Sequence, residues 1–300
     1  SNFITALIED ENGAFWIGTH DGLYQFDREN GAFQSSRADA QKPDKNIIRS
    51  MILDRENFIW FGTHDGLNKF NPATKQFTRY AADKNNPRSL SDNFVRSIFE
   101  SKSGAMWVGT NGGLNHFNRE TGEFTVYQHD KANPRSLSEG DILSILEDNT
   151  GQLWVGNVGG LNKFNQRTNR FQRFRHDAKN PFSISQDQIM SVFEDSRKNL
   201  WVGTRRTGQS GELNKYNFAE KRFEVVKMLG DAVVYAITED RAGRLWFGTF
   251  KGLSSYDAET GRLTEYDAET AGNLPKNVNP QTVITIKENR TGQLLLGTIG

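Results

Sequence analysis

The 300-residue sequence contains no cysteine, only seven prolines and no excess of charge, because 37 Lys and Arg balance 37 Asp and Glu. Without cysteine there is no disulfide framework, no thiolate metal site and no cysteine nucleophile. The zero net charge argues against a general basic surface for nucleic acid and against a polybasic membrane contact. No run approaches the 18 apolar residues of a membrane-spanning helix.

Glycine and aromatic residues are plentiful instead, with 28 Gly, 21 Phe and six Trp. A hydrophobic fraction of 35% and a charged fraction of 25% favour a folded globular chain over a disordered one. The first residues show neither the basic nor the apolar segment of a signal peptide. Composition alone therefore leaves the cellular compartment open.

The dominant feature is an internal repeat marked by the motif Trp-x-Gly-Thr. Successive copies are 44 to 49 residues apart, the fourth ends in Asn, and the seventh has Leu in place of Trp. The copies lie at 16–19, 60–63, 107–110, 154–157, 201–204, 246–249 and 295–298. A period of about 45 residues is the signature of β-propeller blades.

Each repeat contains four short segments rich in β-branched and aromatic residues and separated by Gly or Asn turns, which predicts four antiparallel strands, a to d. We expect an all-β, seven-bladed β-propeller with four-stranded blades, in which the Trp fills the wedge between neighbours. The Gly two residues after the Trp suits a position where a neighbouring aromatic residue or backbone comes close. Residues 1–300 then form a single domain of about six and a half blades, because the last repeat has only strands a and b. The outer edge of 293–298 is expected to be exposed.

The repeat resembles the two-component regulator propeller repeat. The pattern Ile-x-Glu-Asp-x-x-Gly-x-Leu-Trp-x-Gly-Thr-x-x-Gly-Leu-x-x-aromatic-Asp/Asn is cleanest at 237–257 and 145–165. A second typical segment, Asn-Pro-x-Ser-Leu/Ile-Ser, recurs every 47 residues, at 86–91, 133–138 and 180–185. The resemblance covers essentially the whole chain.

This resemblance implies a non-catalytic, periplasmic or extracytoplasmic sensor module of a bacterial signal-transduction receptor. It implies a carbohydrate or other small-molecule ligand, no cofactor, and an output by a histidine kinase or diguanylate cyclase outside this sequence. It implies no nucleic-acid partner for this segment and membrane attachment only through flanking segments. A homodimer of the full-length receptor is compatible with it.

Acidic turns recur at the end of strand a and form an apparent carboxylate array. In most repeats the Asp lies three residues before Gly and six before Trp, as Asp148 does. This spacing predicts that the Asp caps its own hairpin turn instead of serving catalysis or calcium binding. Ser101 and Asn289 stand in the same column, where they could cap a turn but not act as catalytic acids.

His20 and His64 occupy equivalent b–c turns of neighbouring repeats. Two ligands alone do not make a zinc site, so we predict no metal there. The sequence also shows no phosphate-binding glycine loop of the P-loop or dinucleotide type.

Ligand binding is expected at the long d–a connections and the b–c turns, because variable loops on a rigid scaffold commonly bind ligands. One column at the entry to strand a changes chemistry from repeat to repeat, and the fifth b–c turn is expanded. The candidate ligand-binding residues are therefore Arg49, Arg96, Tyr235, Arg205 and Arg206. The alternative is that these arginines only pair with nearby Asp on a solvated face.

Two other functions stay open. Some propellers are enzymes of the lyase or hydrolase type, which would need unrepeated acid and base residues converging on one face. Others are protein-interaction scaffolds, which a neutral surface permits.

Overall fold

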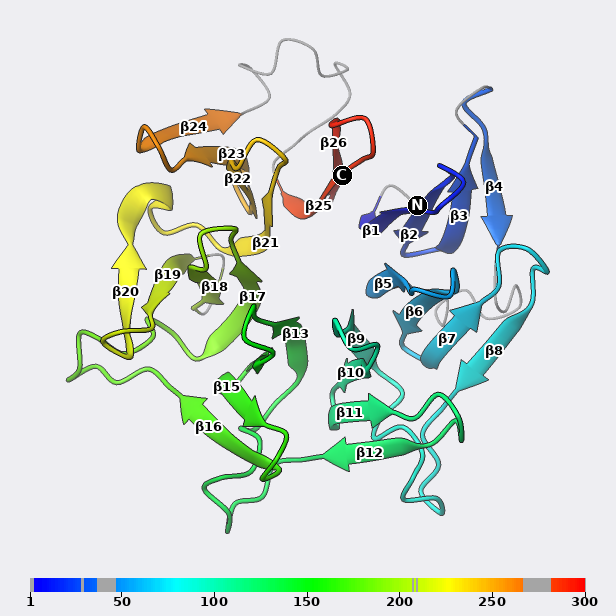
Figure 1. Cartoon of the computed structure of the whole chain (residues 1–300), viewed down its shortest axis with the longest axis horizontal. Helices are drawn as coiled ribbons and strands as arrows, with labels where there is room; N and C mark the ends of the chain where they lie inside the picture. The colour runs from blue at the N-terminus through cyan, green and yellow to red at the C-terminus, as the bar shows by residue number, and fades with distance from the viewer. Residues whose placement is uncertain are drawn as a thin grey trace. The chain divides into compact units, whose positions relative to one another are not determined.

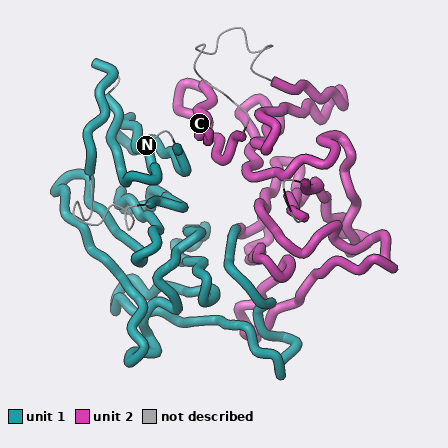
Figure 2. Tube along the Cα trace, turned by 180° about the vertical axis from the view of Figure 1, so that it is seen from behind, with its two compact units in different colours: residues 1, 3–145 teal, residues 2, 146–300 magenta. Residues whose placement is uncertain are grey.

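The computed structural model describes residues 3–27, 30–36, 47–206, 208, 210–266 and 282–299. These residues form antiparallel β-sheets, each made of strands that are consecutive in the chain. A short 3-10 helix, η2, lies at Lys227–Leu229. The chain divides into two compact units, residues 3–145 and 146–300, drawn in two colours in Figure 2. Each unit is described by itself.

Unit 1 holds three four-stranded sheets, here called blades 1, 2 and 3. In each, the strands are ordered as in the chain, and the first strands of neighbouring blades lie side by side (Figure 1). Blade 1 is β1 Ile4–Glu9, β2 Phe15–Thr19, β3 Gly22–Phe26 and β4 Phe33–Ser36. Blade 2 is β5 Ser50–Leu53, β6 Ile59–Thr63, β7 Gly66–Phe70 and β8 Phe77–Tyr80. Blade 3 is β9 Val95–Glu100, β10 Met106–Thr110, β11 Gly113–Phe117 and β12 Phe124–Tyr127.

Unit 2 holds the later sheets, and the division falls inside β13, Ile142–Glu147. Blade 4 is β13, β14 Leu153–Asn157, β15 Gly160–Asn165 and β16 Arg170–Phe174. Blade 5 is β17 Gln188–Glu194, β18 Leu200–Arg205, β19 Gly211–Asn217 and β20 Arg222–Val226. Blade 6 is β21 Val234–Glu239, β22 Leu245–Thr249, β23 Gly252–Asp257 and β24 Arg262–Tyr266. A two-stranded sheet follows, β25 Val283–Glu288 with β26 Leu294–Thr298.

The predicted β-propeller architecture of four-stranded antiparallel blades is confirmed. The described residues show six complete blades, not the seven of the expected architecture, and the β25–β26 sheet is incomplete. The sequence anticipates this difference, because the seventh repeat contains only the first two strand segments. Among the described residues, no helix combines the length and apolar character that crossing a bilayer requires.

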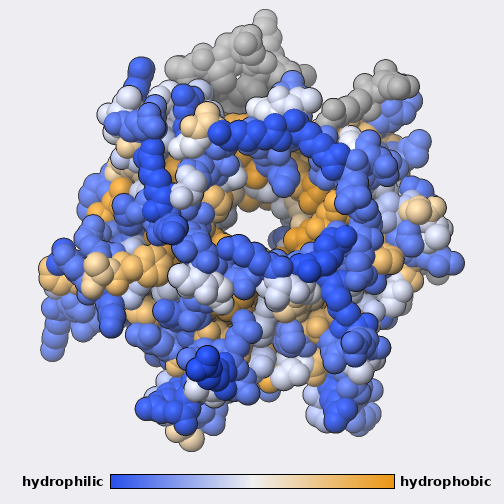
Figure 3. Space-filling view, in the orientation of Figure 1, coloured by the Kyte–Doolittle hydropathy of each residue, from blue (hydrophilic) through white to orange (hydrophobic). Residues whose placement is uncertain are grey.

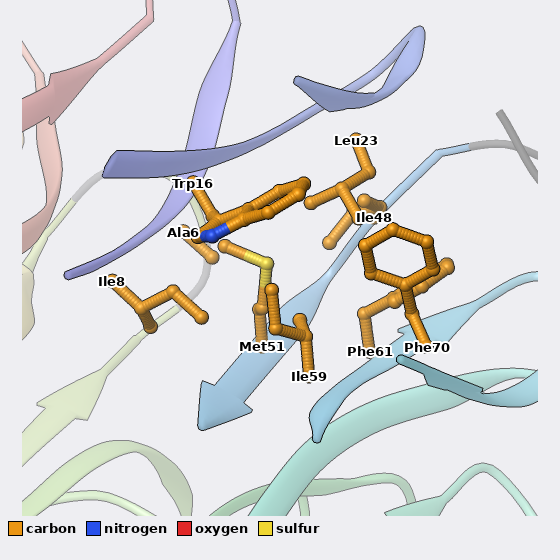
Figure 4. Packing of buried hydrophobic residues seen from close by; sticks show 9 residues of the cluster. All are labelled: Ala6, Ile8, Trp16, Leu23, Ile48, Met51, Ile59, Phe61 and Phe70. Carbon is orange, nitrogen blue, oxygen red and sulfur yellow. The ribbon is translucent and has the colours of Figure 1, made fainter. Parts of the chain in front are cut away.

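The hydrophobic core lies between successive blades, and the repeated Trp fills it as predicted. Trp16 of blade 1 is 1% exposed and packs with residues of blade 2, among them Met51 and Ile59. Figure 4 shows the Met51 side chain between Trp16 and Ile59. Trp60, Trp154, Trp201 and Trp246 each pack in the same way against the following sheet. Hydrophilic residues dominate the face shown in Figure 3, with smaller hydrophobic areas between them.

The Gly of each Trp-x-Gly-Thr motif allows neighbouring blades to approach closely. A Cβ added to Gly109 would lie 2.2 Å from Ser97 Oγ and 2.5 Å from Ile142 Cγ2, which is too close for any side chain. Gly62 meets Val95 of the next blade in the same way, and Gly203 meets Val234. The predicted close approach is therefore real, and its partner is an aliphatic residue of the next blade together with its backbone.

A buried carboxylate joins the first two strands of most blades. Asp148 Oδ1 accepts the backbone N–H groups of Thr150 and Gln152, and Asp148 Oδ2 accepts the indole N–H of Trp154 at 2.8 Å. The same Asp–indole bond, at 2.7 to 2.8 Å, recurs at Asp10–Trp16, Asp54–Trp60, Asp195–Trp201 and Asp240–Trp246. Ser101 and Asn289 accept turn N–H groups at their own positions, as predicted. The acidic turns are therefore structural caps.

Acid should weaken these caps. Burial raises the pKa of Asp148, but hydrogen bonds from Thr150, Trp154 and Gln152 outweigh burial and hold the pKa below its ordinary value. Because the folded-state pKa is lowered, the bonds stabilise the fold above about pH 4, and that stabilisation is lost as the pH falls through the folded-state pKa. We expect Asp148→Asn to lose about 1–3 kcal/mol of unfolding free energy at pH 7 and clearly less at pH 3.

Urea unfolding at both pH values measures this difference. Glu139→Gln, at an exposed position, is the control and should change stability by less than about 0.5 kcal/mol at either pH. Equal destabilisation by Asp148→Asn at pH 7 and pH 3 would show that the carboxylate charge does not matter.

Candidate functional site

The variable column at the entry to the first strand forms a β-bulge in blades 1, 3, 5 and 6 and in the β25–β26 sheet. In blade 3, Val95 pairs with Thr110 and Ser97 with Gly109, so Arg96 has no partner in the ladder register. Equivalent register shifts leave Thr5, Met190, Tyr235 and Ile284 outside the register of their own pairs. A bulge changes the direction of one side chain while the ladder continues on both sides. The recurrent bulge thus gives each of these five sheets one side chain outside the ladder register.

Arg49 lies at the same place in blade 2 and contacts two rings. Its backbone N–H donates to the Gly62 carbonyl, and its Nε–H donates to His64 Nε2 at 3.0 Å. The accepting ring nitrogen must be unprotonated, so this bond selects a neutral imidazole. The His64 ring stacks on Phe94, with centroids 3.8 Å apart, and the Arg49 guanidinium lies 5.8 Å from the Phe94 ring.

Arg96 completes the group from blade 3. Its guanidinium lies 4.4 Å from the Phe94 ring centroid, donates through Nε to Asn111 Oδ1 at 2.6 Å, and forms an ion pair with Asp141 at 2.7 Å. The Arg96 side chain remains 28% exposed. Two guanidinium groups therefore lie near the Phe94 ring, and Arg96 also holds one amide and one carboxylate. This arrangement can hydrogen-bond a polar ligand while packing against its apolar part.

The electrostatics of the group extend to blade 1. Burial, followed by the positive charge of Arg96, lowers the pKa of Arg49. Burial, followed by the charge of Arg49, lowers the pKa of His20, whose ring stacks on Phe3 with centroids 4.7 Å apart. The mutual repulsion of Arg49 and Arg96 would be relieved by an electron-rich ligand group between them.

The other three predicted residues lie in unit 2. Arg205 ends β18, and its Nε–H donates to the Gly208 carbonyl at 2.9 Å. Arg206 follows in the expanded turn and donates its backbone N–H to Ser210. Tyr235 is the bulge residue of β21; burial raises its pKa, and the charge of Arg205 acts in the opposite direction. The structure thus associates Arg49 with Arg96 in unit 1, and Arg205 with Tyr235 in unit 2.

The histidines take part in packing and turn contacts. His129 and His176 each bond a loop carbonyl through Nδ1, of Leu137 and Ile184, and His116 packs on Trp107 with ring centroids 4.6 Å apart. Within the described ranges, no group of three or more His, Asp or Glu side chains could hold a metal ion. His20 and His64, the pair considered for a metal, instead stack on Phe3 and Phe94.

Sequence reasoning missed Phe94, Asn111 and Asp141 as members of the group around Arg49 and Arg96. A usable signal exists for Asn111, because it occupies the same b–c turn position as His20 and His64. Phe94 and Asp141 lie directly before the strand a segments of blades 3 and 4, where the predicted ligand-facing loops end.

The charge of Arg49 should contribute, after burial, to the lowered pKa of His20. Replacing Arg49 with Gln removes a positive charge that disfavours protonation, so the pKa of His20 should rise toward its ordinary value. An NMR pH titration of the His20 ring protons measures it. Arg135→Gln, an exposed arginine, is the control and should leave the titration unchanged. A His20 pKa that does not move in Arg49→Gln would contradict the assigned electrostatics.

Comparison with solved structures supports the fold. The chain aligns over 99% of its length, at 22% identity and a TM-score of 0.81, with the extracellular domain of BT3049, described as a hybrid two component system of B. thetaiotaomicron. It aligns similarly with the extracellular domain of BT4673, described as a one component system of the same organism, at 20% identity and a TM-score of 0.79. It covers only 39% and 37% of those chains. Streptogramin B lyase aligns over 99% of this chain and 91% of its own, at 15% identity and a TM-score of 0.72. At these identities the likeness concerns the fold alone.

The repeats themselves carry the family assignment. No curated protein matches the chain. The family model described as "Two component regulator propeller" matches six segments, residues 1–21, 42–65, 89–112, 136–159, 183–206 and 228–251. Each segment contains one Trp-x-Gly motif and the strand a segment that precedes it. The chain therefore belongs to the two-component regulator propeller repeat family.

Proposed function

We propose that this propeller is a non-catalytic, extracytoplasmic ligand-sensing module of a bacterial signal-transduction receptor. The observation that carries the proposal is the group of Arg49, Arg96, His64 and Phe94, built on bulges and turns of rigid strands. The repeat fold does not need these residues, since other blades have Thr, Met or Ile at the bulge. A residue that differs between blades, at a position where the backbone is the same, can be used for ligand binding without loss of the fold.

The proposed ligand is a carbohydrate or another polar small molecule. Sugars present hydroxyl groups that both donate and accept hydrogen bonds, together with C–H faces that pack on rings. Arg49 and Arg96 supply donors, Asp141 and Asn111 supply acceptors, and Phe94 supplies an aromatic surface. In unit 2, Tyr235 offers a phenol, and burial raises its pKa further above physiological pH.

The hydrogen bonds of the candidate acids and bases support ligand binding without catalysis. A general base needs a side chain that is free to take a proton from substrate. His129 and His176 are bonded to backbone carbonyls, and the capping aspartates accept turn N–H groups and an indole. Their repeated, turn-bound positions support a structural role for these groups.

The signalling context rests on family membership and on the extracellular origin of two similar structures. Because the chain spans well under half of those structures, the output is proposed to lie in other segments, as a kinase or cyclase. Propeller enzymes and interaction scaffolds remain the alternatives to a sensor module.

A binding experiment tests the proposal. A thermal-shift screen of neutral and acidic oligosaccharides identifies a ligand, and calorimetric titration then compares the protein with Arg49→Ala/Arg96→Ala. Losing a charged hydrogen bond costs on the order of 1.5–3 kcal/mol, so affinity should fall roughly 10- to 150-fold. Arg167→Ala, an exposed arginine of a c–d turn, is the control and should bind normally.

The double variant should still unfold at a denaturant concentration close to that of the parent, because neither arginine belongs to the hydrophobic core between the blades and a partly exposed ion pair contributes about 0–1 kcal/mol. Unchanged affinity in the double variant, or a ligand bound at the a–b and c–d turns instead, would refute the assigned site.

We also propose that β25 and β26 are the inner half of a seventh four-stranded blade. They pair with the same register shift as the first two strands of blades 1, 5 and 6. Two further strands on β26 would cover an edge that has no strand partner among the described residues. A chain extended by native flanking residues should therefore melt at a higher temperature than residues 1–300, and equal melting temperatures would argue against a seventh blade.

A further inference from the structure

A groove of about 480 Å³ opens between the turns of blades 1 and 2, at the opposite end of the strands from Arg49 and Arg96. Its wall includes the carboxylates of Asp10, Glu11 and Glu56, the ring of Trp16 and the ammonium of Lys75. The Lys75 nitrogen lies 5.1 Å from the Trp16 ring centroid and donates to Gln25 at 3.4 Å. The groove lining carries three carboxylates and one ammonium; Glu56 also lies 3.9 Å from Arg119 Nη1, and Glu11 accepts a hydrogen bond from Asn57 Nδ2.

The equivalent crevice between blades 2 and 3 of the same unit is filled by an arginine side chain of the protein itself. Between blades 2 and 3, Arg119 of the c–d turn donates to Asp54 Oδ2 and to Glu100 Oε1, both at 2.8 Å, and lies 5.9 Å from the Trp60 ring. Asp54 Oδ2 accepts the Trp60 indole at the same time. The capping carboxylate therefore holds an arginine guanidinium in addition to its own blade's tryptophan.

The first crevice is open because the equivalent arginine is missing. Pro72 stands where Arg119 stands, in the same turn: Asn71 Oδ1 accepts the Ala73 N–H, as Asn118 Oδ1 accepts that of Glu120. In unit 2 the equivalent residue, Phe218, packs edge-on against Trp154. A side chain thus covers the capping Asp–Trp pair in two crevices, whereas Pro72 has no group that reaches the pair.

The acceptors for a guanidinium are present in the open crevice. Asp10 Oδ2 accepts the Trp16 indole at 2.8 Å, as Asp54 Oδ2 accepts that of Trp60, and a carboxylate oxygen can accept a second bond. Leu53 replaces Glu100, and the two a–b turns instead place Glu11 and Glu56 in the groove lining. Glu11 already accepts one bond from Asn57 Nδ2 and Glu56 is 3.9 Å from Arg119, but each carboxylate has two oxygens that can accept further bonds. Asn57 also lines the groove, and its buried Oδ1 accepts no hydrogen bond from the described part of the chain. A buried acceptor without a donor is costly.

We propose that this groove is a docking site for an arginine side chain of a partner protein, whose guanidinium takes the place that Arg119 fills one crevice further on. Arginine suits the site better than lysine, because its planar group can reach two carboxylates and lie against a ring at once. This interaction is separate from ligand sensing, since it uses none of the residues around Phe94.

The probe is the peptide acetyl-Gly-Gly-Arg-Gly-Gly-amide, with the lysine analogue beside it. The indole N–H resonance of Trp16 reports binding, because this group donates to Asp10, and Trp16→Phe identifies the resonance. The arginine peptide should shift the resonance saturably and the lysine peptide should bind several-fold more weakly. Pro72→Arg should abolish the response, because the protein's own guanidinium then fills the crevice, and the matched control Pro72→Ala should retain it.

A second variant keeps the proposal testable if Pro72→Arg does not fold. Glu56→Gln at an exposed position should raise the Kd for the arginine peptide about two- to fivefold, while Glu120→Gln, exposed in the next c–d turn, should not change it. Equal binding of the two peptides, or full binding to Pro72→Arg, would overturn the proposal. So would saturation of the groove by a second copy of this chain, detected by sedimentation before any peptide is added.

Discussion

The hydrogen bond between a buried aspartate and the tryptophan six residues later is the interaction on which five of the six complete blades depend. A carboxylate removed from water is costly unless donors surround it, and here two turn N–H groups and one indole N–H do so. The bond fixes the turn between the first two strands and orients the indole at the same time. The fixed indole then fills the space against the next blade, so local turn chemistry and packing between blades have one origin.

Much of the fold could be predicted because the repeat appears seven times in one chain. Trp60, Gly62 and Asp54 each recur at a fixed spacing, and repetition separates structural positions from variable ones without any second sequence. The Asp–indole bond was not predicted, although both residues were identified, because spacing shows a turn cap but not the direction of a side chain. The β-bulge was missed for a similar reason: one extra residue in a strand leaves no periodic signal.

The candidate site was predictable only in part. Arg49 and Arg96 could be selected as departures from a repeated column, yet their contacts come from three different blades. His64 was considered for a metal and turned out to accept a bond from Arg49, and Phe94 looked like any of the 21 phenylalanines. Contacts between side chains of different repeats depend on how the blades pack, which a single-repeat pattern does not encode.

The bulge at the start of the first strand in four blades and in the β25–β26 sheet has a consequence for evolution. The side chain there lies outside the ladder register, so its replacement leaves the neighbouring backbone pairs and the Asp–Trp pair intact. Thr5, Arg96, Met190, Tyr235 and Ile284 already show how widely this position varies within one molecule. A lineage can therefore exchange these residues one blade at a time and acquire new recognition properties while the scaffold keeps its stability.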